Sequence, residues 1–346
     1  MTNRSHEAFH DPLITPDEVV GLPEKFFDRF VFNLHPVDGS RPAVIVGLGL
    51  YPVRDTVDGF AQLCTDTEQR NARFATELSA TPWDRCGPLR YEVLEPNTRW
   101  RIVLGDNPTN MTFDLVWTAR TPAWWGDVEV TNASGQKTSF AHLFQSGYVD
   151  GELRIDGTAI TVDHWYSQRD RSRGVRTMQG GQGLHIWFQA QFPDRSVGFL
   201  LVESRNGGRL LLEGAVMHTD GSLDEITDVQ HDLVFDDQLD LRSGRVLVTT
   251  ASGATYHIAA DASGRGGLMA GAGYGGHHGR KFGRDHVEGE VWPLDGTVTQ
   301  RTVDSSLTDR LSRFEWNGVR GSGIFEFALT RSSSYTYRPT LEVDDP

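Results

Sequence analysis

Residues 140–176 read FAHLFQSGYVDGELRIDGTAITVDHWYSQRDRSRGVR, and this stretch carries the clearest fold signal in the chain. Asp156-Gly157 is the dipeptide preferred in a two-residue type I′ turn, because both positions of that turn need a positive φ. The dipeptide lies between two runs in which apolar and polar residues alternate. The stretch therefore predicts a β-hairpin.

The register of this hairpin decides which side chains share a face. A tight turn predicts the cross-strand pairs Ile155 with Thr158, Leu153 with Ile160, Gly151 with Val162, and Val149 with His164. One face of the hairpin is then apolar, and we expect it to border an enclosed space. His164 and Tyr166 continue the parity of that face, which predicts an imidazole and a phenol pointing into the same space.

Length and patterning indicate the fold class. The chain has 346 residues, which exceeds the size at which a single core usually stops growing. Short apolar runs alternate with Gly, Asp-Gly, Asn-Gly and Ser-Gly breakers, and helical periodicity is scarce. This pattern is typical of an all-β sandwich or barrel, built as two domains or as one tandem-duplicated fold.

Composition also suggests domain boundaries. Residues 1–24 are polar and contain several prolines and histidines, so we expect an arm that lies on the surface. Residues 177–183 are rich in glycine and glutamine, as a flexible linker would be. We therefore predict a first domain over residues 25–176 and a second over 177–346.

A second glycine-rich stretch covers residues 264–279. Gly271, Gly273 and Gly276 satisfy the spacing of a dinucleotide-binding motif, but no βαβ unit surrounds them. We therefore reject a dinucleotide site. The stretch is expected to be a loop or bulged strand at a barrel rim, or a lid over a ligand.

The formal net charge of −14 argues against a nucleic acid or an anionic membrane surface as the partner. No apolar run approaches the roughly 18 residues that a spanning helix needs, and the N-terminal residues lack an apolar signal region. We therefore expect a cytoplasmic protein without stable membrane insertion.

The usual sequence signatures of metal, cofactor and nucleophile sites are missing. Cys64 and Cys86 have neither a CxxC spacing nor a nearby histidine pattern. His277, His278 and His286 form a local cluster, but adjacent histidines on a strand point to opposite faces. No GxSxG elbow and no P-loop occurs. We therefore expect neither a metal nor a cofactor.

The remaining chemical candidate is Asp170. A carboxylic acid next to a histidine and a tyrosine, at the mouth of an apolar cavity, can protonate an alkene or an oxygen leaving group. Arg169 and Arg171 would favour the carboxylate form unless strand alternation directs them elsewhere. The alternative is that Asp170 and its arginines form a structural ion-pair network, with His164 and Tyr166 as ordinary core residues.

Tryptophans near the hairpin are candidates for ligand contact. Residues 121–126 are expected to form a loop that carries Trp124 and Trp125, either as a plug of a barrel end or as a lid. Their π-faces, and that of Trp165, could stabilise a developing cation. Trp165 has the opposite parity to the apolar face.

Several residues form a pattern seen in a known family: Gln145, Gly147, Gly151, Asp156-Gly157, Arg169-Asp170, Ser172, Gly174 and Arg176, with a weaker match at Gly321–Glu326. This pattern resembles the actinobacterial lipocalin-like family related to AttH proteins and carotenoid 1,2-hydratases (hydroxyneurosporene synthases). The resemblance implies two tandem lipocalin-like (calycin) antiparallel β-barrels and a lipid or isoprenoid ligand. The family usually has His and Trp after the aspartate, where this chain has Arg171 and Arg173, so the imidazole must come from elsewhere. His164 and His142 are the nearest candidates in sequence.

We therefore expect a cofactor-independent acid/base enzyme that hydrates, dehydrates or cyclises a hydrophobic isoprenoid or terpenoid at a C=C bond. Asp170 is the expected proton donor, and Tyr166 and His164 are expected to relay the proton or position water. The expected substrate contacts are Trp124, Trp125, Trp165, Gln145 and Arg176. The alternative is a non-catalytic lipid or isoprenoid carrier that uses the same cavity.

Overall fold

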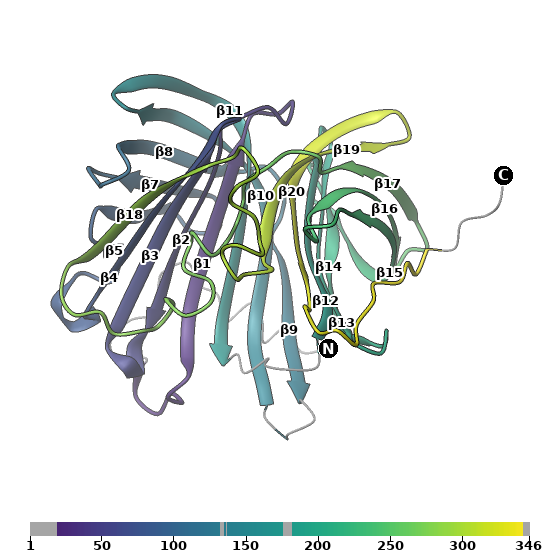
Figure 1. The fold of residues 1–346 in the computed structure, drawn as a ribbon, viewed down its shortest axis with the longest axis horizontal. Coiled ribbons are helices and arrows are strands. Elements are labelled where there is room, and N and C mark those ends of the chain that lie inside the picture. The colour runs from purple at the N-terminus through teal and green to yellow at the C-terminus, as the bar shows by residue number, and fades with distance from the viewer. Residues whose placement is uncertain (1–18, 132–134, 136, 176–181, 342–346) are drawn as a thin grey trace.

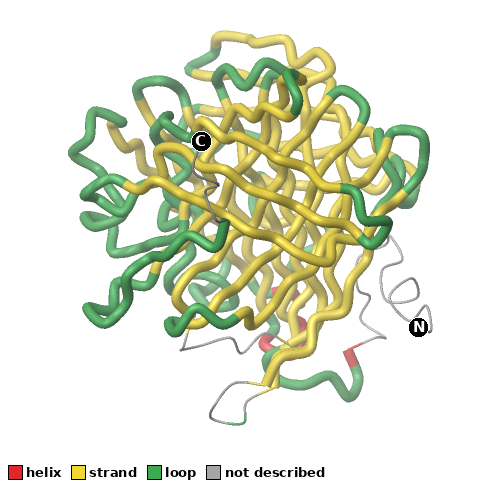
Figure 2. The backbone as a smooth tube through the Cα atoms, turned by 90° about the vertical axis from the view of Figure 1, so that its right-hand side faces the viewer, coloured by secondary structure: helices red, strands yellow, loops and turns green. Residues whose placement is uncertain are grey.

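The computed structural model describes residues 19–131, 135, 137–175 and 182–341, and its regular structure is almost entirely β-strand (Figures 1 and 2). Two antiparallel sheets lie side by side, the N-terminal one on the left of Figure 1 and the C-terminal one on the right. The 3-10 helices Pro52–Arg54 and Leu78–Ala80 join strands of the N-terminal sheet. Within the described residues, no helix is long and apolar enough to cross a membrane. The all-β prediction is confirmed.

The N-terminal sheet is a curled layer of 12 strands. In sheet order its strands are β18 (His286–Pro293), β4 (Glu68–Thr76), β3 (Thr56–Cys64), β2 (Ala43–Tyr51), β1 (Phe26–His35), β11 (Thr158–Val175), β10 (Lys137–Ile155), β8 (Met111–Ala119), β7 (Arg99–Leu104), β6 (Leu89–Glu95) and β5 (Arg85–Cys86), and β9 (Trp124–Thr131) pairs with β10 outside this order. Residues 124–126, which we predicted to lie in a loop, therefore begin a strand.

The C-terminal sheet closes on itself as an antiparallel barrel. Its strands are β12 (Gln182–Phe192), β13 (Arg195–Ser204), β14 (Arg209–His218), β15 (Leu223–Phe235), β16 (Leu241–Thr250), β17 (Thr255–Asp261), β19 (Thr308–Trp316) and β20 (Val319–Leu329). The predicted barrel is thus confirmed in the second half of the chain. The first half forms the same kind of antiparallel sheet, but its strand order ends at β18 and β5.

The chain crosses back to the N-terminal sheet between β17 and β19. The glycine-rich segment, residues 264–279, lies against this sheet, where Gln62 and Gln69 each donate a hydrogen bond of 3.0 Å to the Leu268 carbonyl. β18 then pairs with β4 and appears in green beside the purple strands of Figure 1. The second predicted domain thus contributes a strand to the first sheet. Residues 1–18 of the predicted arm and 177–181 of the predicted linker lie outside the described residues.

The hairpin of β10 and β11 has the predicted turn, with φ of 50° at Asp156 and 80° at Gly157. Its first cross-strand pairs, out to Gly151 with Val162, are also as predicted. A β-bulge then shifts the register, so that Val149 pairs with Trp165 and not with His164. The extra residue of the bulge lies on β11, where Asp163 and His164 oppose Asp150 and His164 has a φ of 49°. Gly151, beside the bulge on β10, has a φ of 144°, and a Cβ there would lie 2.2 Å from the Asp114 carbonyl oxygen.

Beyond the bulge, side chains of β11 alternate between two environments. Arg171 points into the N-terminal sheet, where its Nε and Nη2 donate to Asp28 at 2.9 and 2.7 Å. Arg169 points the same way and lies 5.3 Å from the ring centroid of Trp117. Asp170 lies between them and points toward the C-terminal barrel. Strand alternation therefore keeps both guanidinium groups away from this carboxylate.

Of the five apolar clusters in the described residues, three surround the candidate site. One fills the curl of the N-terminal sheet and another fills the barrel. The third joins the two sheets, and its large members are Trp124, Phe144, Trp187 and Leu200. The candidate site lies beside this third cluster, because Trp187 and Leu200 belong to both.

Candidate active site

A cavity of about 100 Å³ lies between the two sheets. Its lining residues are Arg29 and Val31 (β1), His142 (β10), Asp170 and Ser172 (β11), His185 and Trp187 (β12), Leu200 (β13), Asp309 (β19), Glu326 (β20), and Met269, Tyr274 and Leu307 from the connections. Met269 and Tyr274 belong to the glycine-rich segment, which thus forms one wall. The cavity combines apolar walls with several ionisable groups.

A chain of three ionisable side chains begins at the cavity wall with Asp170 and His142 and continues behind it to Glu213. His142 Nε2 lies 2.6 Å from Asp170 Oδ2, and His142 Nδ1 lies 2.5 Å from Glu213 Oε1. Burial by itself lowers the pKa of His142, but the charges and hydrogen bonds of the two carboxylates outweigh burial and raise this pKa to about 9. At neutral pH the imidazole therefore carries a proton on each nitrogen and donates to both carboxylates.

The register of the strands explains how these groups meet. Phe144 pairs with Asp170 and His142 pairs with Ser172 across β10 and β11, so the imidazole and the Asp170 carboxylate are diagonal neighbours on one face. Trp187, which β12 contributes from the barrel, donates its Nε1–H to Asp170 Oδ2 at 3.0 Å. Two donors therefore converge on a single oxygen of Asp170.

Glu213 reaches His142 because β9 makes room for it. Gly126 lies opposite His142 in the pairing of β9 with β10. A Cβ at Gly126 would lie 2.7 Å from Glu213 Oε2 and 2.3 Å from the ring of Trp124. Glu213 itself is only 8% exposed, and its Oε2 is buried without a hydrogen-bond partner in the described structure.

Arg29 adds a positive charge to the cavity wall. Its guanidinium donates to the Tyr51 hydroxyl and lies 5.7 Å from the ring centroid of Tyr274. Burial lowers the pKa of Arg29, but the neighbouring Tyr51, Tyr274 and Asp58 outweigh that effect and raise it. Arg29 therefore remains a cation beside the apolar walls.

Of the three predicted catalytic residues, the structure places only Asp170 at the cavity. Tyr166 is buried elsewhere, with its ring stacked on Tyr148 at 5.8 Å and the Arg120 guanidinium 4.7 Å from its centroid. His164 is 69% exposed at the bulge, where its Nδ1 lies 2.9 Å from Asp150. The bulge explains this placement, because it ends the parity that would direct His164 inward.

The predicted tryptophans also lie away from the cavity lining. Trp165 packs in the core of the N-terminal sheet, contrary to its expected parity, because the bulge pairs it with Val149. Trp124 stacks on Phe144 with their centroids 5.5 Å apart, in the apolar cluster between the sheets. Trp125 follows it in β9 and is half-buried. Trp187 is the tryptophan that borders the cavity.

Gln145 supports the N-terminal sheet and does not line the cavity. It accepts a hydrogen bond of 2.9 Å from Arg169, and its amide donates to the carbonyl oxygens of Asn97 and Thr121 at 2.9 and 3.2 Å. It lies on the same face as Arg169, opposite to Asp170. Arg176, the last predicted substrate contact, lies outside the described residues.

Sequence reasoning missed most of the groups that the barrel contributes. Glu213 follows three leucines in the run Leu210–Val216, and an acid in so apolar a strand is the signal that could have marked it. Glu326 was assigned to the face opposite Phe325 and Phe327, which agrees with its place in the cavity wall. His142 was indicated only as a possible source of the imidazole.

A group of potential metal ligands lies on the hairpin, outside the cavity lining. Ligand atoms of Asp150, Asp163 and His164 lie within 4.8 Å of one another. All three side chains are largely solvent-accessible, at 43%, 84% and 69%. Exposed acidic groups of this kind occur commonly without a metal.

Residues 14–336 match a family of unknown function, DUF8625. The chain belongs to the DUF8625 family. No curated protein matches the sequence of this DUF8625 member. Its structure is similar to that of an AttH-like protein from Nitrosomonas europaea, at 12% identity and a TM-score of 0.61, over 91% of this chain and 96% of that one. It is also similar to CghA with Sch210972, at 10% identity and a TM-score of 0.50, over 92% of this chain and 93% of that one.

These likenesses show that the DUF8625 chain has the fold of the AttH-like proteins. The resemblance drawn from the hairpin residues is therefore confirmed at the level of fold. At 10–12% identity the comparison extends no further than the fold. The chemistry of the DUF8625 cavity has to follow from its own residues.

Proposed function

We propose that this protein is a cofactor-independent acid/base enzyme and that Asp170 exchanges a proton with a hydrophobic substrate. The observation that supports this most directly is the 2.6 Å contact of Asp170 Oδ2 with His142 Nε2 at a cavity lined by residues of both sheets. A hydrogen-bonded acid/base pair beside apolar walls suits general acid–base catalysis.

The hydrogen bonds around Asp170 suggest how the group works. Both donors, His142 and Trp187, bind Oδ2, which leaves Oδ1 for the substrate. Glu213 binds the far nitrogen of His142, so it fixes the ring and stabilises the imidazolium. A proton that reaches Asp170 can then be shared along the series Asp170, His142 and Glu213.

The cavity walls suggest the substrate class. Val31, Leu200, Met269, Leu307 and the Trp187 ring give it an apolar lining. An isoprenoid or terpenoid suits such walls, and the reaction would add or remove water, or close a ring, at a C=C bond. The volume of about 100 Å³ is below the range of roughly 300–1,000 Å³ usual for ligand pockets, so it accommodates the reacting part of a larger molecule. Met269 and Tyr274, on the glycine-rich segment, are the lining residues that would move to admit the rest.

An Asp170→Asn variant tests the proposal. Asn keeps the size of the side chain but cannot exchange a proton, so turnover should fall by about 10²–10⁴-fold. Terpene alcohols and polyenes would be incubated in heavy-oxygen water, and products followed by mass spectrometry. Asp163→Asn is the matched control, because Asp163 is exposed on the same hairpin. Full turnover by Asp170→Asn of a substrate that the wild type converts would refute the proposal.

The apolar lining also suits a second candidate, a lipid or isoprenoid carrier without catalysis. In that case the purified protein should retain an apolar molecule in native mass spectrometry and leave it unchanged. Asp170→Asn would then lower the thermal stability while ligand retention stays the same. If the wild type converts the retained molecule and Asp170→Asn does not, the carrier hypothesis is excluded.

A further inference from the structure

A second pair of carboxyl groups lies in the cavity wall contributed by the barrel. Asp309 on β19 and Glu326 on β20 are direct cross-strand partners, and both line the cavity. Directly opposite residues on one face of an antiparallel pair have Cβ atoms about 4.5–5.5 Å apart, and like charges at that distance repel. Such a placement disfavours the state in which both carboxyl groups are ionised.

Glu326 already has a partner in this pair. His185 Nε2 donates to Glu326 Oε1 at 2.6 Å, and β12 carries this histidine on the strand next to β20. Asp309 is 5% exposed, its side chain is hydrogen-bonded to Glu326, and its Oδ1 is buried without a hydrogen-bond partner in the described structure. A hydrogen bond between two carboxyl groups needs a proton on one of them, and Asp309 is the member without a histidine donor.

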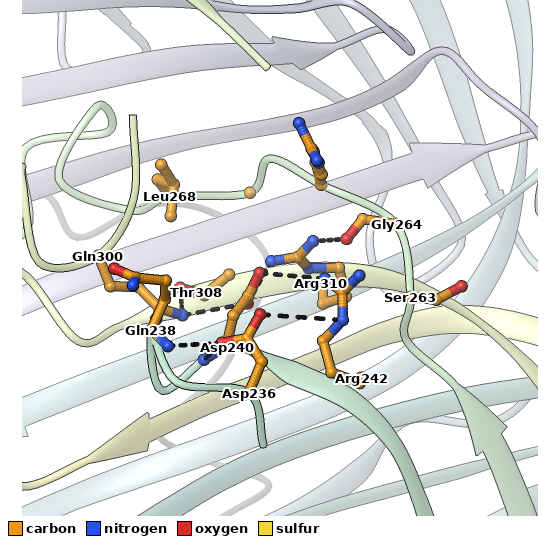
Figure 3. A network of polar contacts seen from close by, with 12 residues as sticks. Asp236, Gln238, Asp240, Arg242, Ser263, Gly264, Leu268, Gln300, Thr308 and Arg310 are labelled. Atoms are coloured by element: carbon orange, nitrogen blue, oxygen red, sulfur yellow. Dashed lines mark hydrogen bonds and ion pairs between the residues drawn. The ribbon is translucent and has the colours of Figure 1, made fainter. Parts of the chain in front are cut away.

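The surroundings of Asp309 disfavour its charged form. Burial raises the pKa of Asp309 well above its usual value, and the adjacent Glu326, the Cys64 thiol and the more distant Asp170 raise it further. Arg310, the next residue, points away on the other face of β19, where Asp240 and the Gly264 carbonyl hold it (Figure 3). The nearest guanidinium in sequence therefore does not neutralise Asp309.

The glycine-rich segment packs against the backbone of Asp309. The Asp309 amide donates to the Gly267 carbonyl at 2.8 Å. Gly267 has a φ of 76°, and a Cβ at this position would overlap the Asp309 carbonyl oxygen. Only glycine allows so close an approach in this conformation. The segment therefore covers the backbone of Asp309 and leaves its side chain facing the cavity.

The two walls of the cavity thus hold carboxyl groups in contrasting environments. Asp170 accepts hydrogen bonds from two donors, one of them the His142 imidazolium. Asp309 is next to another carboxyl group. A carboxyl group surrounded by hydrogen-bond donors is suited to act as the base, and a carboxyl group beside another carboxyl group is suited to act as the acid.

We infer that Asp309 is the general acid of this site, donating a proton to an oxygen atom of the substrate while Asp170 acts as the base. The inference rests on the proposed function and narrows its substrate class to apolar molecules that carry a hydroxyl or carbonyl group, as opposed to pure hydrocarbons. In an elimination, Asp170 takes a proton from carbon and the C–H electrons form the double bond. The C–O bond breaks toward oxygen, which receives the proton of Asp309 and leaves as water. Addition of water is the reverse, and proton exchange with solvent resets both groups.

Infrared difference spectroscopy tests the proton on Asp309 without any need for turnover. The wild type minus Asp309→Asn spectrum at neutral pH should contain the C=O stretch of a protonated carboxyl group, and that band should shift in heavy water. Asp170→Asn is the matched control and should keep the band. Absence of the band from the wild type, or its persistence in Asp309→Asn, would overturn the inference. If Asp170→Asn retains turnover, the proposed function fails, whereas the infrared result still decides where the proton lies.

Geraniol, which has a hydroxyl group, and the hydrocarbon myrcene test whether Asp309 donates to an oxygen atom of the substrate. Geraniol should shift the Asp309 band, because its hydroxyl accepts the hydrogen bond, and Asp309→Asn should weaken geraniol binding by about two- to tenfold. Myrcene should leave the band in place, and its affinity should be the same in both proteins. A band that saturating geraniol leaves unchanged would contradict the role of Asp309 as donor to oxygen. Circular dichroism of Asp309→Asn establishes that the variant is folded.

Discussion

The proton on His142 should make the stability of the fold depend on pH in a defined window. The pKa of His142 rises from 6.5 to about 9 in the folded state. Below pH 6.5 the imidazole is protonated in both the folded and the unfolded chain, so its contribution is fully present. Between pH 6.5 and 9 only the folded state holds the proton, so unfolding releases it and stability falls as the pH rises. At about 1.36 kcal/mol per pH unit, the loss amounts to about 3 kcal/mol.

The perturbation that isolates this contribution neutralises the whole series of groups. The triple variant His142→Gln, Asp170→Asn, Glu213→Gln keeps the approximate shape and removes every titrating atom. Replacing His142 alone would bring two buried carboxylates together and create a new pH dependence. Asp309→Asn serves as the common background, because the pKa of Asp309 is raised as well and would add a slope of the same sign.

The assay is denaturant-induced unfolding at several pH values from 6.5 to 9, with the histidine resonances followed by NMR over the same range. Both proteins carry Asp309→Asn. Across this window the free energy of unfolding of the protein with His142, Asp170 and Glu213 intact should fall by about 3 kcal/mol more than that of the triple variant. The His142 resonance should titrate near pH 9. Parallel stability curves for the two proteins, together with a His142 midpoint at or below 6.5, would refute the reasoning.

Two further predictions concern the supports of the site. Arg171→Met removes two close donors to the buried Asp28 carboxylate and leaves longer contacts such as Arg173 Nε at 4.0 Å, so it should lower the free energy of unfolding by about 3–5 kcal/mol. Arg154→Met, at an exposed ion pair on the same hairpin, should cost at most about 1 kcal/mol. Equal losses in denaturant unfolding would contradict the burial argument. Gly126→Ala places a Cβ against Glu213 and Trp124 and should move the His142 midpoint from about 9 toward 6.5, as measured by NMR. Gly105→Ala, where a Cβ meets only Pro88 at 3.6 Å, is its control. An unchanged His142 midpoint in Gly126→Ala would show that Glu213 does not raise the pKa of His142.

Local signals in the sequence were sufficient for the hairpin and the fold class. Asp156-Gly157 specified the turn because few other dipeptides adopt two positive φ values, and the register followed from it as far as Gly151. Nothing in the alternation shows that β11 carries an extra residue at Asp163–His164. This bulge reversed the parity of the rest of β11, which is why Trp165 and His164 were assigned to the wrong faces.

Asp170 lies at the wall of the cavity, but the sequence predicted only part of its surroundings. The sequence showed that arginines flank it and that strand alternation could separate them from it, and the Arg171 contact with Asp28 bears this out. The sequence did not show that the open face of β11 is covered by a second sheet. Trp187, Glu213 and Asp309 come from that sheet, and no pattern local to the hairpin specifies how two sheets pack.

The dependence of the site on both sheets has an energetic consequence. His142 and Asp170 come from one sheet, and Glu213 comes from the other, so one of the two hydrogen bonds that raise the pKa of His142 exists only while the sheets are in contact. The apolar cluster of Trp124, Phe144 and Leu200 maintains that contact and excludes water, which strengthens each charge interaction beside it. The same packing that stabilises the interface therefore sets the protonation of the groups that would carry the chemistry.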